Sequence, residues 1–275
     1  MPINQDVEFH YARGDLVAAI REALKAAGKH PSALAVDDLT AIDQMHVRGR
    51  EATRELAQRL GLTADMRVLD VGSGIGGPSR LLAAEYGCHV VGIDITDDYC
   101  RAATAIAHWL GLDSRLEYRH GDALAMPFGD ASFDVVWTQH AAMNIPDKAR
   151  LYAQIFRVLR PNGRLALYDV LQGPGGAPHF PVPWASEPAI SFLVTPDELR
   201  QLLESAGFAV ESWTDRSAEG CAWARRTDER LSAGAAPPLG GALLHGGDFA
   251  VKVKNLRRNL DEHRIVLIEA VCRRP

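Results

Sequence analysis

Apolar residues along the chain follow two patterns, short continuous runs and longer stretches with helical spacing. The runs have the length of buried strands and fall at 66–71, 88–93, 116–119, 133–138 and 164–170. Helical spacing appears between or after them, at 80–87, 97–110, 147–159 and 195–206. Apolar strands that alternate with helices predict an α/β fold, in which helices cover both faces of a mainly parallel sheet.

The regions on either side of this alternation differ from it. Helical spacing at 15–27 and 49–60, each followed or closed by a glycine, predicts a helical N-terminal cap over 1–62 and a main domain over 63–275. The segment 171–194 holds five prolines and three glycines, which predicts a lid insertion. The C-terminal extension that follows is expected to contain strands at 208–213 and 264–273, helices at 219–231 and 248–261, and a Gly/Pro-rich loop at 234–247.

A glycine cluster follows the first strand of the main domain, in the stretch VLDVGSGIGGPSR at 68–80. Glycines there let the main chain turn with positive φ and let a ligand approach it, while the next helix offers unpaired N–H groups. Gly72, Gly74 and Gly77 match the dinucleotide fingerprint G-x-G-x-x-G, whereas Gly72, Gly74 and Gly76 match the G-x-G-x-G of S-adenosylmethionine enzymes. A tight turn without any ligand is the third interpretation of the same stretch.

Three carboxylates stand at or near predicted strand ends. Asp94 ends the second strand, 22 residues after Gly72, where a carboxylate can accept hydrogen bonds from both hydroxyls of an adenosine ribose. Asp70 lies inside the first strand, where a dinucleotide-binding strand usually has apolar residues. There it can brace the glycine loop or reach an ammonium group through water. Asp122 follows the third strand and can accept from the amino group of adenine, with the N–H of Ala123 facing a ring nitrogen.

Composition narrows the class of partner. The formal net charge is −5 and no cluster of Lys and Arg stands out, so neither nucleic acid nor an anionic membrane is expected as a partner. No apolar run approaches the ~20 residues of a membrane span and no secretory leader is recognised at the N-terminus, so a cytoplasmic location is expected. The four cysteines lack C-x-x-C spacing, and no metal requirement is expected.

Five motifs in order carry a resemblance to a known family. VLDVGSGIGG, VVGIDIT, GDALAMPF, FDVVWTQH and LRPNGRLAL together resemble the class I S-adenosylmethionine-dependent methyltransferases over about 66–170. The resemblance implies a Rossmann-like, seven-stranded, mainly parallel sheet whose last strand is antiparallel. More loosely, the cap, DQMHVRGREAT at 43–53, SFLVTPDELRQLLESAGF at 191–208 and the C-terminal extension resemble the sarcosine/dimethylglycine, sterol and tocopherol methyltransferases.

This resemblance implies a cofactor, a partner and residue roles. S-adenosylmethionine would be the methyl donor, S-adenosylhomocysteine the product and a small molecule the acceptor, and a homodimer is a possible assembly. Besides Asp70, the residues implied to bind the cofactor are Gly72, Gly74 and Gly76 at its methionine part, Asp94 with Ile95 at the ribose, Asp122 and Ala123 at the adenine, Gln139 near the sulfonium, and Arg48 beside His46 at the carboxylate.

Methyl transfer is an in-line displacement in which the protein mainly aligns the reactants. Nitrogen is the expected acceptor atom, with carbon and oxygen as alternatives. His140, with an ordinary histidine pKa near ~6.5, is the candidate base for an amine, or else a structural histidine. Met143, Asn144, Tyr11 and Trp184 are candidates for the acceptor pocket, the two aromatics forming a wall with Phe180 and Phe192.

Two rivals remain open from the sequence. The match of Gly72, Gly74, Gly77 and Asp94 to the dinucleotide fingerprint allows an NAD-dependent oxidoreductase. A nucleoside-binding protein that uses its cap to bind a partner, without catalysis, is the non-enzymatic alternative.

Overall fold

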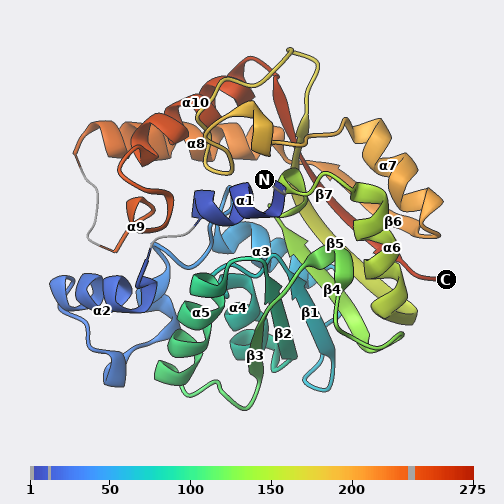
Figure 1. The fold of residues 1–275 in the computed structure, drawn as a ribbon, viewed down its shortest axis with the longest axis horizontal. Helices are drawn as coiled ribbons and strands as arrows, with labels where there is room; N and C mark the ends of the chain where they lie inside the picture. Colours follow the sequence, from blue (N-terminus) through green and yellow to red (C-terminus); the bar gives the residue numbers. More distant parts are fainter. Residues whose placement is uncertain (1–2, 12–13, 235–238) are drawn as a thin grey trace.

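The computed structural model describes residues 3–11, 14–234 and 239–275. Seven strands form one sheet in the order β3-β2-β1-β4-β5-β7-β6 (Figure 1). Strands β1 to β5 pair in parallel, and β7 is antiparallel to both of its neighbours. The strands are β1 Arg67–Val71, β2 His89–Asp94, β3 Leu116–His120, β4 Phe133–Gln139, β5 Leu159–Gln172, β6 Ala209–Asp215 and β7 Ile265–Arg273. The predicted fold class, with its antiparallel last strand, is confirmed.

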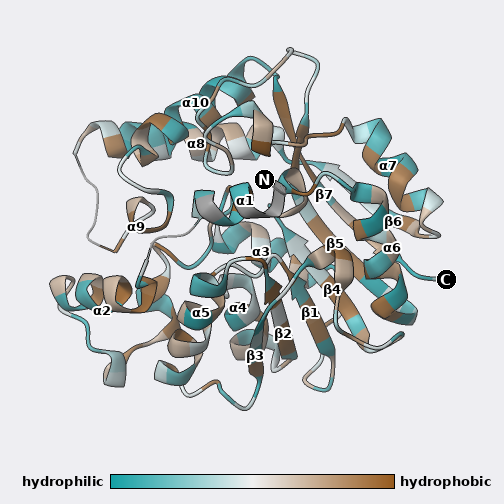
Figure 2. Ribbon diagram, in the orientation of Figure 1, coloured by the Kyte–Doolittle hydropathy of each residue, from teal (hydrophilic) through white to brown (hydrophobic). Residues whose placement is uncertain are grey.

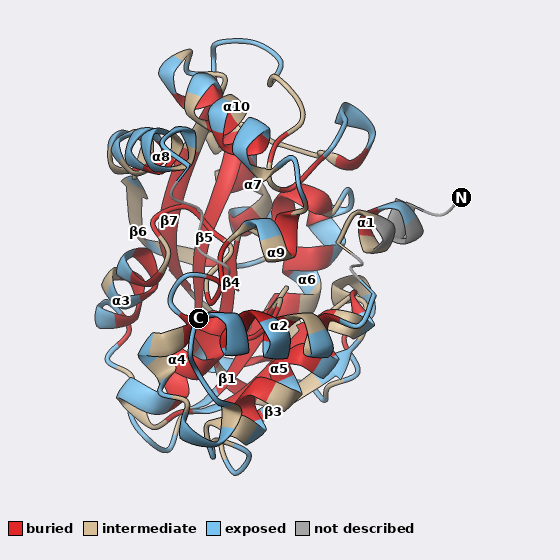
Figure 3. Ribbon diagram, turned by 90° about the vertical axis from the view of Figure 1, so that its left-hand side faces the viewer, coloured by how far each residue is buried: buried red, intermediate tan, exposed pale blue. Residues whose placement is uncertain are grey.

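The central strands are buried on both faces (Figure 3), and apolar residues run along them (Figure 2), whereas the edge strands β3 and β6 are partly exposed. Neighbouring residues of β1 show the burial of both faces, because Val68 packs into one hydrophobic cluster and Leu69 into another, on the opposite face. The Val68 side is covered by α3 Arg50–Gln58, α4 Gly77–Tyr86 and α5 Asp97–Trp109, and the Leu69 side by α6 Lys148–Val158 and α7 Pro196–Ser205.

The N-terminal cap contains two helices ahead of α3, namely α1 Ile3–Tyr11 and α2 Leu16–Ala26. Helix α2 packs on α5 through a separate cluster that includes Leu16, Ile20 and Ile106. Two short 3₁₀ turns, Pro31–Ala33 and Val36–Leu39, join α2 to the segment before α3. Helix α1 was not expected from the sequence, because its nine residues have little apolar periodicity.

In the described part of the C-terminal extension there are three helices, α8 Ser217–Ser232, α9 Ala242–His245 and α10 Phe249–Asp261. Helices α8 and α10 lie side by side and α9 precedes α10, at the upper left of Figure 1. The short α9 falls within the loop predicted at 234–247, of which 235–238 lie outside the described residues. No described helix is both long and apolar enough to cross a membrane.

Several element boundaries differ from those predicted, and the largest difference is the start of β5, at Leu159 rather than residue 164. Helix α4 begins at Gly77 rather than at residue 80, so the glycine run itself forms the helix start. Strand β5 extends to Gln172 because Gln172 still pairs with Ile265 of β7. The insertion therefore starts at residue 173 instead of 171. It contains an isolated bridge between Val182 and Ala185 and a 3₁₀ turn at Pro188–Ile190.

Candidate active site

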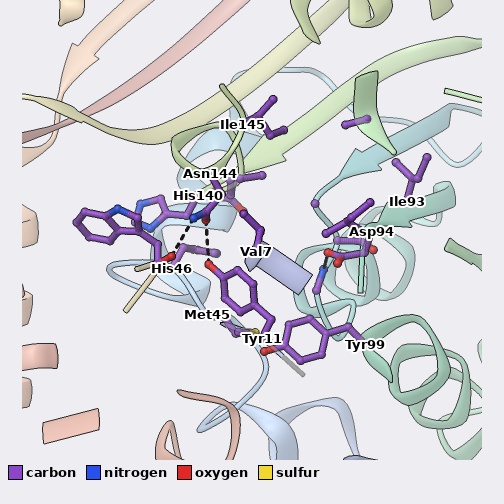
Figure 4. A pocket seen from close by; sticks show the side chains of 18 of the residues that line it. Val7, Tyr11, Met45, His46, Ile93, Asp94, Tyr99, His140, Asn144 and Ile145 are labelled. Atoms are coloured by element: carbon purple, nitrogen blue, oxygen red, sulfur yellow. Dashed lines mark hydrogen bonds between the residues drawn. The ribbon is translucent and has the colours of Figure 1, made fainter. Parts of the chain in front are cut away.

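A cavity lies over the carboxyl ends of β1, β2, β3 and β4 (Figure 4). This is the edge at which open α/β sheets bind their ligands. The loop after β1, the ends of β2 and β4 and the turn after β3 line its floor, while α1, the insertion and α9 close it from above. Predicted site residues that line it are Tyr11, His46, Gly72, Gly74, Asp94, Ile95, Asp122, Ala123, Gln139, His140, Met143, Asn144 and Trp184.

The glycine loop has little room for side chains. Gly72 has φ +74°, and a Cβ on it would collide with the Cβ of Ala141 after β4. Gly76 has φ +80°, and a Cβ there would collide with the ring of Tyr118 from β3. Close approach of neighbouring strands, as well as the positive φ angles, therefore requires glycine at these positions.

Asp94 supports the same loop from the end of β2. Its Oδ2 accepts a hydrogen bond from the N–H of Gly74 at 2.8 Å, and its Oδ1 accepts from the N–H of Thr96 at 2.9 Å. Desolvation raises the pKa of the Asp94 carboxyl above its usual value, although the two backbone bonds oppose this. Each carboxylate oxygen has a further lone pair, and the carboxylate lies in the cavity wall, so it can also accept from a ligand hydroxyl.

Gln139 presents a fixed amide at the end of β4. Its Oε1 accepts from the indole N–H of Trp137 and from the Thr53 hydroxyl, each at 3.0 Å. Because an indole N–H can only donate, this contact identifies the oxygen end of the amide. The Nε2 of Gln139 is buried and has no hydrogen-bond partner among the described residues. The cavity therefore contains an amide donor available to a ligand.

Two buried histidines lie next to each other beside Gln139. The rings of His46 and His140 are 5.8 Å apart, and the ring of His140 lies 5.0 Å from that of Tyr168. Desolvation lowers the pKa of His46 to about 4. Desolvation and the neighbouring His46 lower the pKa of His140 well below 6.5. Both imidazoles are therefore neutral at pH 7, and the Nε2 of His140 has no partner among the described residues.

On the roof of the cavity, Asn144 ties the cap to the insertion. Its Oδ1 accepts from the Tyr11 hydroxyl at 3.0 Å, and its Nδ2 donates to the carbonyls of Trp184 and Ile190 at 2.8 Å. Asn144 is therefore held in the structure by its own polar contacts. Met143 and Trp184 supply apolar surface nearby. Phe180 and Phe192, expected in the same aromatic wall, do not line the cavity.

The structure corrects the prediction for Arg48, which does not line the cavity. Its guanidinium donates to Glu55 of α3 at 2.6 Å, and only 3% of its side chain is exposed. An arginine whose buried ion pair lies within the cap is not placed to bind a cofactor carboxylate. Its neighbour His46 does line the cavity, with Nε2 3.1 Å from the Thr53 hydroxyl.

Asp70 and Gly76 also lie outside the cavity lining. The Oδ2 of Asp70 accepts from the Ser79 hydroxyl at 2.6 Å beneath the start of α4, and desolvation raises the pKa of Asp70 to about 7. Asp70 thus links β1 to α4 rather than facing a ligand, and Tyr118 covers Gly76. Among the described residues, no group of three His, Cys, Asp or Glu side chains is arranged to hold a metal ion.

Sequence reasoning missed several residues of the lining, including Asp43, Met45, Ser73, Tyr99 and His245. Asp43 forms a fully buried ion pair with Arg80 of α4, and its Oδ2 has no partner among the described residues. Asp43 stands in the DQMHVRG stretch that the family resemblance singled out for His46. That resemblance was the one available signal for it.

Comparison with known proteins agrees with this geometry. A family model described as a methyltransferase domain matches residues 69–167. Methyltransferase GfsG of Streptomyces halstedii is 34% identical over 134 residues, 49% of this chain and 48% of that protein. The 27-O-demethylrifamycin SV methyltransferase of Amycolatopsis mediterranei is 40% identical over 131 residues (46% and 48%). The sterol 24-C-methyltransferase ERG6A of Gibberella zeae is 40% identical over 116 residues (42% and 30%). The matches thus span less than half the length of these relatives.

Some solved structures with the same fold superpose on the whole length of this chain. The [4+2]-cyclase SpnF superposes with a TM-score of 0.74 at 24% identity, covering 100% of this chain and 97% of its own. The geranyl diphosphate C-methyltransferase of Streptomyces coelicolor, solved with S-adenosyl-L-homocysteine, gives 0.71 at 15% identity, covering 100% and 98%. At these identities the likeness establishes the fold alone. The family match and the sheet order together show that residues 69–167 form a methyltransferase domain within a seven-stranded methyltransferase-type fold.

Proposed function

We propose that this chain transfers a methyl group from S-adenosylmethionine to a small molecule bound under its cap. The observation that carries the proposal is the cavity at the strand ends, where Asp94 both braces the glycine loop and lies in the wall. In this arrangement Asp94 would hold the ribose of the cofactor, and Asp122 with Ala123 would contact the adenine. The Nε2 of Gln139 would donate to the methionine end.

The packing around the first residue of α4 argues against the alternative function, an NAD-dependent oxidoreductase. Dinucleotide folds place the pyrophosphate at this helix N-terminus. Here the backbone of Asp43 lies against Gly77, the first residue of α4, so that a Cβ on Gly77 would collide with the Asp43 carbonyl. Strand β7 also lies between β5 and β6, unlike the 3-2-1-4-5-6 order of dinucleotide-binding sheets.

For the acceptor atom, we propose a hydroxyl oxygen rather than the nitrogen expected from the sequence. Of the relatives named above, one is a sterol 24-C-methyltransferase and one a 27-O-demethylrifamycin SV methyltransferase, and neither name points to a nitrogen acceptor. A neutral His140 with an unpartnered Nε2 suits a hydroxyl, since it can accept the proton that becomes acidic as the new C–O bond forms. In that step the S–CH₃ bond breaks, neutral S-adenosylhomocysteine leaves, and the positive charge passes from sulfur to the imidazole.

The test uses S-adenosylmethionine with a trideuterated methyl group and a panel of hydroxyl-bearing apolar small molecules. We expect mass spectrometry to find a labelled product, and NMR to place the label on oxygen. A label on nitrogen or carbon would overturn the assignment of the atom while leaving the transfer intact. An increase in melting temperature with NADH but not with S-adenosylhomocysteine would overturn the function itself.

A further inference from the structure

A second cavity lies behind the first, under the C-terminal extension. We refer to it as the C-terminal chamber, and its lining includes Trp223 and Thr227 of α8, Leu244 of α9, and Phe249, Val253 and Leu256 of α10. The segment 41–47 of the cap closes its other side. None of these six residues was assigned a function above.

The chamber adjoins the cavity at the strand ends. Six residues line both spaces, namely Met45, His46, His140, Pro183, Trp184 and His245. His140 belongs to this shared wall, so the imidazole with the unpartnered Nε2 lies where the two spaces meet. A molecule that presents a polar group to His140 therefore has the chamber beside it.

Aromatic and aliphatic side chains of α8, α9 and α10 form one wall of the chamber, while polar side chains, among them Gln44 and Arg230, line other parts of it. Val253 and Leu256 are almost fully buried, at 1% and 2% exposure, and they contribute side by side from α10 together with Phe249. No Asp, Glu or Lys lines the chamber among the described residues, and Arg230, which does, is exposed to solvent. Such a surface favours an apolar ligand body through the hydrophobic effect and aromatic contacts.

We propose that the C-terminal chamber holds the apolar body of the methyl acceptor and so selects acceptors with a bulky apolar group next to the reacting hydroxyl. The proposal rests on the proposed function, since it assigns a substrate class to the same site. It gives the C-terminal extension a role in specificity. It also identifies Thr227 and Val253 as residues whose size sets the space available.

The test measures binding of N-phenyl-1-naphthylamine, a neutral fluorescent apolar probe, to the full chain saturated with S-adenosylhomocysteine. Val253→Trp places a large ring inside the chamber, whereas Val251→Trp, on the same helix, changes a side chain that is 50% exposed and serves as the matched control. We expect Val253→Trp to raise the Kd of the probe at least tenfold and Val251→Trp to leave it within twofold. Calorimetric affinity for S-adenosylhomocysteine should be unchanged in both variants.

Thr227→Phe fills the chamber from α8 and provides a second variant should Val253→Trp not fold. Probe affinity that stays at the wild-type value in either folded variant would overturn the proposal. Competition between the probe and S-adenosylhomocysteine would do the same, because the probe would then occupy the first cavity. Failure to find any methylated product, with probe binding lost in the filled variants, would count against the proposed function and not against the chamber as an apolar site.

Discussion

Asp94 shows how one side chain can support a loop and still be available to a ligand. Both of its oxygens accept backbone N–H groups, from Gly74 and Thr96, and the carboxylate lies in the cavity wall. Asp70, only one strand away, lies outside the cavity lining and accepts from the Ser79 hydroxyl through its Oδ2. Asp94 and Asp70 are both aspartates at or near the end of a strand, so the sequence alone does not distinguish them. Their different neighbours in the fold give them different roles.

Replacing Asp94 should therefore affect the cofactor strongly. We expect Asp94→Ala to weaken S-adenosylhomocysteine binding more than tenfold, because the ribose loses its acceptor and Gly74 loses its brace. Asp97→Ala is the control, since Asp97 is exposed on α5 and pairs only loosely with Arg101, at 3.5 Å. Titration calorimetry measures both, and near-normal affinity in Asp94→Ala would remove the ribose assignment.

His140 has a different pH dependence from the one its sequence suggests. With its pKa well below 6.5, the imidazole stays neutral from pH 8 down past pH 6 and loses its acceptor lone pair only in more acidic solution. We expect kcat to be independent of His140 titration between pH 6 and 8, and His140→Ala to lower kcat by about 10²–10⁴ throughout that range. A wild-type rate that rises with pH through 6.5, with no such rise in the variant, would contradict this account.

Asp70 should make the stability of the protein depend on pH. Its pKa is raised from 3.8 to about 7, so the folded state holds a proton that the unfolded state releases. Its contribution to the free energy of unfolding is therefore fully present below pH 4 and is lost as the pH rises through about 7. We expect Asp70→Asn to flatten the decrease in stability between pH 5 and 8, measured by urea unfolding. The exposed Asp65→Asn is the control, and an unchanged slope in Asp70→Asn would contradict the assignment.

At the scale of elements, a buried ion pair links the cap to the glycine loop. Asp43 precedes α3 and pairs with Arg80 of α4, and both side chains are 0% exposed. Arg80 also donates to the carbonyl of Ile75 in the loop. This contact therefore couples the position of the cap to the shape of the cofactor loop.

Removing one partner of this pair should be costly, because the other charge would be left buried. We expect Asp43→Ala to lower the free energy of unfolding by about 3–5 kcal/mol. Glu85→Ala breaks a pair with Arg54 in which both side chains are accessible, at 33% and 46% exposure, and should cost less than about 1 kcal/mol. Urea unfolding measures the free energy of unfolding of both variants. Equal decreases would contradict the prediction that the buried Asp43 pair contributes more to stability than the exposed pair.

Sequence patterns predicted elements well where local periodicity and burial agree. The seven strands all appear, and for the central ones the reason is that continuous apolar runs buried on both faces leave few alternatives. Helix α1 was missed because tertiary contacts, such as that of the Tyr11 hydroxyl with Asn144, hold a segment with little periodicity of its own. The full length of β5 was missed at both ends, because Leu159 is defined by pairing with Phe133 of β4 and Gln172 by pairing with Ile265 of β7, both distant in the sequence.

At the scale of the whole molecule, the site was predictable where topology alone determines position. Parallel strands bring their carboxyl ends together, so Asp94, Asp122 and Gln139 meet in one cavity although they are far apart in the chain. The partner of Arg48 was not predictable from the sequence. A buried guanidinium can pair with the carboxylate of Glu55 as well as with the carboxylate of a ligand. The C-terminal chamber was not predictable either, because it forms only when α8, α9 and α10 fold over the segment 41–47.

The central claim is that the cavity at the strand ends holds S-adenosylmethionine, and a crystal structure of the chain with S-adenosylhomocysteine tests it most directly. We predict that the ribose hydroxyls lie within hydrogen-bonding distance of Asp94 and that the adenine lies beside Asp122. The sulfur should face the side of the cavity that contains His140. Density for the ligand elsewhere on the protein, with this cavity filled by side chains, would contradict the account.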